Sequence, residues 1–128
     1  SVYKTMNSEL NKINLEFNNY KTFNAGDVRC NVTGCYFTSS RGKTIFSENN
    51  FLQAYSVIYD HLVKLFELLH LEPGFKSLSW NGGGIKVYCK NNVMINAYNS
   101  TQNVMSSFTS LCSKDRNSKR KQIFIWMK

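Results

Sequence analysis

The side chains with the greatest chemical potential in this chain are its cysteines and histidines: Cys30, Cys35, Cys89, Cys112, His61 and His70. A zinc site requires close cysteine pairs, or a cysteine pair with a histidine pair. Only Cys30 and Cys35 are close together, so we expect no metal site. The even number of cysteines leaves two alternatives open. The thiols are free and buried, with Cys89 and Cys112 on core faces, or the cysteines form a disulfide framework.

No arrangement typical of an enzyme accompanies these residues. The two histidines are nine positions apart in an expected helix, and no serine or cysteine nucleophile with its base can be identified around them. The glycines Gly82 to Gly84 lack the Lys-Ser/Thr ending of a phosphate-binding loop. The carboxylates are few and scattered, so no acid–base pair is visible. We therefore expect a protein that is not an enzyme and needs no cofactor.

Positive charge is the strongest compositional signal. Sixteen Lys and Arg residues stand against eight Asp and Glu residues, which gives a formal net charge of +8. Much of the excess lies between Lys114 and Lys128, where Asp115 is the one acid. Such a field attracts polyanions, among them nucleic acid, acidic lipid and heparin-like sugar. The segment from Ser118 to Lys121 also fits a nuclear-import patch, which indicates an intracellular and nuclear location. A solvated tail that only aids solubility is the alternative.

A predicted hairpin from Ile85 to Tyr98 carries the functional hypothesis. With a two-residue turn at Asn91-Asn92, one face of the two strands holds these residues: Lys86, Tyr88, Lys90, Val93, Ile95 and Ala97. The opposite face holds Ile85, Val87, Cys89, Met94, Asn96 and Tyr98, a set that suits packing on helices. The first face mixes lysines with aromatic and aliphatic groups, as in surfaces that contact phosphates, sugars and bases. An ordinary exposed face protected by lysines is the alternative.

Further basic residues could extend this surface to more phosphates: Arg29, Arg41, Lys43, Lys119, Arg120 and Lys121. We therefore predict a nucleic-acid-binding protein that works through a basic and aromatic sheet face. The sequence does not distinguish DNA from RNA, or one strand from two.

The segment from Gly84 to Ser100, followed by an expected helix, resembles the strand, turn, strand and helix unit of TATA-box-binding-protein-like repeats. In that family two such units form a curved antiparallel sheet whose concave face lies in the DNA minor groove. The resemblance covers residues 84–112. It implies that the contact face consists of these residues: Lys86, Tyr88, Lys90, Val93 and Ile95. The glycine usual after the second strand is missing, because Ala97-Tyr98 stand there.

The elements that position these residues can be read from hydrophobic spacing. Apolar residues at helical spacing predict a long helix over 51–71, ended by Pro73-Gly74, and a shorter helix follows Asn99 up to Cys112. Alternation predicts strands at 13–17, 28–38, 43–46, 75–80, 85–90, 93–98 and 123–127, the second of them with a bulge at Gly34. Residues 1–11 are interpreted as a disordered segment and 113–121 as a basic loop. The expected fold is one α+β domain over 1–128. Its antiparallel, twisted sheet has both helices, one long and one short, on one face.

Two other functional classes remain open. Sequons at Asn31-Val32-Thr33 and Asn99-Ser100-Thr101, together with disulfides, would indicate a secreted or viral interaction module whose basic face meets an acidic protein or glycan. The abundance of Asn, Lys, Tyr and Phe suggests an AT-rich genome, such as that of a parasite or a large DNA virus. The wide apolar coverage of the long helix would suit a homodimer or a subunit of a larger assembly. No apolar run is long enough for a membrane span.

Overall fold

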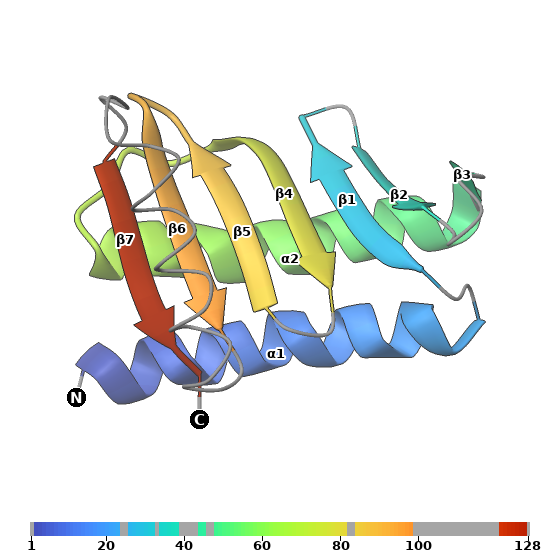
Figure 1. The fold of residues 1–128 in the computed structure, drawn as a ribbon, viewed down its shortest axis with the longest axis horizontal. Helices are drawn as coiled ribbons and strands as arrows, with labels where there is room; N and C mark the ends of the chain where they lie inside the picture. The colour runs from blue at the N-terminus through green and yellow to red at the C-terminus, as the bar shows by residue number, and fades with distance from the viewer. Residues whose placement is uncertain are drawn as a thin grey trace, which may run out of the picture.

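In the part of the chain that the structure describes, two helices lie on one face of a seven-stranded sheet (Figure 1). The computed structural model describes residues 2–23, 26–32, 34–38, 44–45, 48–81, 84–98 and 121–127. The elements follow in the order α1 Val2–Phe23, β1 Asp27–Asn31, β2 Gly34–Thr38, β3 Thr44–Ile45, α2 Glu48–Leu68, β4 Phe75–Asn81, β5 Gly84–Cys89, β6 Val93–Tyr98 and β7 Lys121–Trp126. The predicted helix over 99–112 and the basic loop before Lys121 fall outside the described residues.

The strands are arranged in the order β3-β2-β1-β4-β5-β6-β7. Every neighbouring pair is antiparallel except β6 and β7, which run parallel. The α+β class is therefore confirmed, whereas the prediction of a wholly antiparallel sheet was wrong at this edge. A parallel neighbour needs a long connection rather than a tight turn, and residues 99–120 separate the two strands in sequence.

The start of the chain forms α1, so two interpretations of the sequence were wrong. Residues 1–11 were taken as disordered and 13–17 as a strand, but Val2–Phe23 is one helix. Leu10, Ile13 and Phe17 are fully buried at helical spacing, whereas Leu15 is 60% exposed. A strand would have placed Ile13, Leu15 and Phe17 on the same face. The apolar residues of this short segment fit both periodicities, and burial against α2 and the sheet decides for the helix.

The extended run expected from Val28 to Thr38 is a hairpin rather than one strand with a bulge. Asn31 of β1 pairs with Gly34 of β2 in an antiparallel register, so the chain reverses between them. The Asn31 Oδ1 atom accepts a hydrogen bond from the Gly34 backbone N at 3.0 Å. Gly34 has a φ of 148°, a conformation that favours glycine. The glycine interpreted as a bulge therefore allows the chain to reverse.

The long helix α2 confirms the predicted element, with a small shift of its ends. It ends at Leu68, before Pro73, and His70 adopts a left-handed φ of 57°. Two backbone hydrogen bonds close the end, from Leu71 N to Phe66 O at 2.8 Å and from His70 N to Glu67 O at 3.2 Å. This is the pattern of a Schellman motif, in which the residue after the helix is left-handed. His70 therefore has a structural position at the helix end.

The core lies between the sheet and the two helices. Trp80 on β4 stacks against Phe17 on α1, with ring centroids 5.5 Å apart, and its Nε1 atom donates to Asn14 Oδ1 at 2.6 Å. Buried residues of α2 complete this layer: Ala54, Ile58, Leu62, Leu65 and Phe66. Because α1 packs along α2, it accounts for much of the apolar width that the sequence left open to a protein partner.

The first turn of α1 contacts the end of β7. The Tyr3 hydroxyl donates a hydrogen bond to the Trp126 carbonyl oxygen at 2.7 Å, and Figure 1 shows both chain ends at this side of the molecule. Within the described residues, neither helix combines the length and the hydropathy that a membrane-spanning segment requires.

Candidate nucleic-acid interface

The β5–β6 hairpin forms as predicted, but its register differs by one residue. Tyr88 pairs with Met94, Val87 with Ile95 and Lys86 with Asn96. Asn91 and Asn92 both have positive φ, as expected for turn residues, but Lys90 belongs to the loop as well. Three residues therefore separate the paired strands instead of two. A shift of one residue exchanges the two faces of a strand, so all of β6 is reversed relative to β5.

The reversal removes two residues from the predicted contact face. Val93 and Ile95 lie in the hydrophobic core beside Val87 and Cys89. Their assignment to a nucleic-acid surface was wrong, because the longer loop turns them toward the helices. Ala97 is buried with them.

The other residues of β6 lie on the outward face. Met94, Asn96 and Tyr98 had been assigned to the core face, and that assignment was wrong for the same reason. They are nevertheless buried on the side away from the helices, and Tyr98 stacks on Phe124 of β7 with ring centroids 6.5 Å apart. The part of the outward face that is accessible among the described residues therefore lies on β2, β1, β4 and β5, and on the edge strand β7 beyond β6.

On these strands the register places two cations in one row. Arg29 of β1 pairs with Ser79 of β4, and Ser79 pairs with Lys86 of β5. Tyr36 of β2 lies next to Arg29 on the other side. The following row contains Ser77 and Tyr88. We call these side chains the basic sheet face: Arg29, Tyr36, Ser77, Ser79, Lys86 and Tyr88.

This face is electrostatically positive at its centre. Arg29 is exposed and Lys86 is half-buried, and neither forms an ion pair with a described acid. Asp27 is exposed two residues before Arg29, at the beginning of β1. Strand alternation places the Asp27 side chain on the same side as Arg29 but farther along the strand. The cations of the row therefore remain available for an anionic ligand.

The remaining predicted contact residues lie elsewhere. Lys90 is in the hairpin loop, where its Nζ atom is 3.9 Å from Glu72 Oε1 and its side chain packs beside Gly74. Lys121 is exposed at the start of β7, and its backbone N donates to Asn92 O at 3.0 Å. Four further residues lie outside the described part of the chain: Arg41, Lys43, Lys119 and Arg120.

A disulfide supports the hairpin that carries Arg29 and Tyr36. Cys30 and Cys35 are opposite each other in the β1–β2 register and form a disulfide. For this pair, the disulfide alternative is therefore the one that the structure contains. Both half-cystines are buried on the helix side. Their neighbours Arg29 and Tyr36 therefore point outward from a covalently closed hairpin.

Cys89 is a buried free thiol, as its position in the strand pattern predicts. Burial raises the pKa of this thiol to about 11, with a smaller opposing effect from the backbone of Ile95. The thiolate is the nucleophilic form, so Cys89 is unreactive near neutral pH. Cys112 lies outside the described residues. Within the described ranges, no group of three or more His, Cys, Asp or Glu side chains could hold a metal ion.

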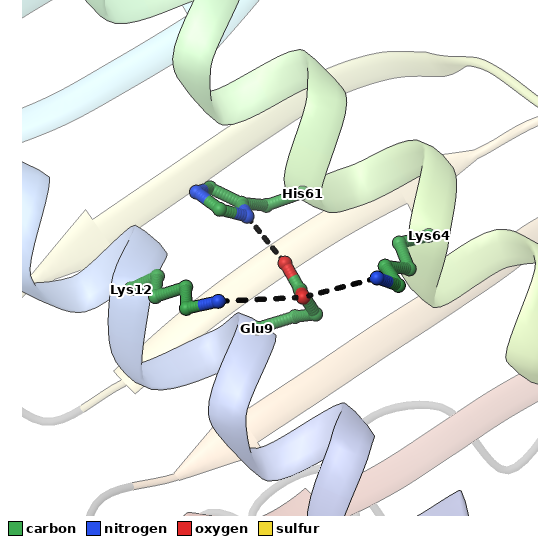
Figure 2. A network of polar contacts seen from close by, with 4 residues as sticks. All are labelled: Glu9, Lys12, His61 and Lys64. Carbon is green, nitrogen blue, oxygen red and sulfur yellow. Dashed lines mark hydrogen bonds and ion pairs between the residues drawn. The ribbon is translucent and has the colours of Figure 1, made fainter.

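A second polar cluster, between the helices, was missed by the sequence interpretation. The Glu9 carboxylate on α1 accepts a hydrogen bond from His61 Nδ1 on α2 (Figure 2). Lys12 Nζ and Lys64 Nζ lie 3.8 and 3.9 Å from its other oxygen. The Glu9 side chain is only 6% exposed. No nucleophile takes part, so this cluster is best explained as a polar contact that aligns α1 with α2.

No family model matches the chain, and neither a curated protein nor a solved structure matches it significantly. The functional interpretation therefore depends on the geometry of the basic sheet face.

Proposed function

We propose that this protein binds nucleic acid through the basic sheet face. The observation that carries the proposal is the row formed by Arg29, Ser79 and Lys86 across three adjacent strands. Two cations project from the sheet on the side away from the helices, and a short hydroxyl side chain lies between them. Tyr36 and Tyr88 add aromatic surface beside the cations. Cations that neutralise phosphates and rings that contact sugars or bases are the two components of such surfaces.

Binding would be driven mainly by charge. Each phosphate neutralised by Lys or Arg releases condensed counterions, so the affinity falls as the salt concentration rises. The net charge of +8 would also accelerate the encounter with a polyanion, because long-range attraction steers association. Lys121 pairs with Val93, which is buried in the core, so strand alternation places its side chain on the helix side of the sheet and not on the basic sheet face. Minor-groove binding in the manner of TATA-box-binding-protein-like repeats stays a prediction.

The test is a fluorescence-anisotropy titration of labelled oligonucleotides at several salt concentrations with an Arg29→Ala/Lys86→Ala variant. We expect the variant to bind more weakly, and the slope of log K against log salt to become shallower by about 0.7–0.9 for each lost phosphate contact. Lys90→Ala is the control, since it removes one positive charge, against two in the double variant, at a position that faces Glu72. A loss of binding free energy from Lys90→Ala half as large as that from the double variant would indicate that net charge alone acts, and an absence of binding at low salt would refute the proposal.

A second candidate is favoured by the Cys30–Cys35 disulfide. Disulfides persist in oxidising compartments and are rare in the cytosol and the nucleus. The same face would then meet an acidic protein or glycan outside the cell or on a virion. The decisive measurement is the oxidation state of Cys30 and Cys35 in protein from its native source, after immediate alkylation and peptide mass spectrometry. This candidate predicts that the pair is joined, and reduced thiols there would reject it.

A further inference from the structure

We infer that the ligand of the basic sheet face is a single-stranded nucleic acid whose backbone crosses β4 between Arg29 and Lys86 while a base stacks on Tyr36. This inference rests on the proposed function and adds the strand state and the binding mode. Tyr36 was not among the residues expected from the sequence. It is brought to the face by its pairing with Arg29 in the β1–β2 hairpin.

The spacing of the strands defines the path of such a ligand. Adjacent strands lie about 4.8 Å apart, so the Cα atoms of Arg29 and Lys86 are separated by about 10 Å. The side chains between these cations are Ser77 and Ser79, which are short and can donate or accept hydrogen bonds. A backbone over β4 would therefore have one cation on each side and hydroxyl groups beneath it.

The position of this face within the sheet favours a single strand over a duplex. Proteins read the major groove of a duplex by placing a helix or a two-stranded ribbon into it. Arg29, Ser79 and Lys86 stand instead on β1, β4 and β5, each of which has a neighbouring strand on both sides. An interior sheet surface enters a minor groove only when the duplex is unstacked and bent, at a cost of about a few kcal/mol per base step, and a single strand does not incur this cost. Aromatic side chains on open sheet faces stack the exposed bases of single strands, as in the common four-stranded RNA-binding modules.

The accessible area suits a short contact. From β2 to β5 the face spans about 14 Å, given the usual distance between neighbouring strands. Sheet platforms of this kind hold about two or three bases. Tyr36 offers a ring at one end of the row, and Tyr88 lies in the next row on β5.

The experiment compares one sequence as single-stranded DNA, single-stranded RNA and blunt duplex, together with an abasic strand of the same phosphate count. We expect both single strands to bind more tightly than the duplex, and the abasic strand to lose about five-fold or more in affinity because it cannot stack. Tyr36→Ala should weaken single-strand binding by a similar factor, while Tyr36→Phe, which retains the ring, should bind as the unmodified protein does. The difference between the DNA and RNA arms reports contacts to the sugar.

The abasic strand keeps the inference testable even where Tyr36→Ala does not fold. Equal affinity for the abasic and the complete strand would overturn stacking, and tighter binding of the duplex would overturn the preference for one strand. In both cases sensitivity to Arg29→Ala/Lys86→Ala would show that the face still binds nucleic acid. Insensitivity to that double variant would instead reject the proposed function itself.

Discussion

Replacing Trp80 with alanine should lower the free energy of unfolding by about 3–5 kcal/mol. Trp80 is the largest of the fully buried side chains and connects the centre of the sheet to α1 through its stack on Phe17. Its removal would leave a cavity that neighbours on a strand and a helix cannot fill without moving. It would also leave Asn14 Oδ1 without its indole donor. Urea unfolding followed by circular dichroism measures the loss.

Trp80→Phe provides the matched control. Phenylalanine keeps an aromatic ring against Phe17 but cannot donate to Asn14, so we expect a smaller loss of about 1–3 kcal/mol. A loss below 1 kcal/mol for Trp80→Ala would contradict the assignment of Trp80 to the centre of the core.

The second large effect is expected at Glu9. His61→Leu should lower the free energy of unfolding by about 2–3 kcal/mol, because it leaves a buried carboxylate without its closest hydrogen-bond donor. Lys12 and Lys64 would compensate only in part, since both lysines are more than half exposed and lie near the distance limit of an ion pair. This loss is smaller than that for a fully buried pair, because His61 retains access to solvent.

A double-mutant cycle separates the pair from its surroundings. Glu9→Leu/His61→Leu removes the buried charge together with its donor, and we expect it to be more stable than His61→Leu alone. Replacement of a buried ion pair by apolar residues is often neutral or stabilising, whereas removal of one partner is costly. If the loss of unfolding free energy in the double variant instead equals the sum of the losses in the two single variants, Glu9 and His61 act independently. The contact drawn between them in Figure 2 would then not contribute to stability.

Local patterns predicted most of the sheet and the long helix, because strand alternation and the helical spacing of α2 need no tertiary information. These patterns failed where two possible hairpin registers differ by one residue. The hairpin loop contains Lys90 as well as the two asparagines, and this single residue moved Val93 and Ile95 from the predicted surface into the core. Short apolar segments such as Ile13 to Phe17 fit both a strand and a helix until their burial partners are known.

The candidate site was predicted only in part for a related reason. Arg29, Lys86 and Tyr88 could be placed on an outward face by alternation alone. Their proximity depends on the strand order, which puts β1 beside β4 although a helix separates these strands in sequence. If Gly34 had been interpreted as part of a turn, pairing the residues on either side of that turn would have placed Tyr36 opposite Arg29. The role of Glu9 could not have been predicted in this way, because it depends on the contact between α1 and α2.

The hydrogen bond between Tyr3 and Trp126 has a consequence for the order in which the protein folds. It joins residues separated by 123 positions, so it closes a loop of almost the whole described chain. Such closure has a large entropic cost and becomes favourable only after the intervening sheet has formed. We therefore expect this contact to form in the last steps of assembly. Loosening of the first turn of α1 would therefore also remove a hydrogen-bond partner from the last residues of β7.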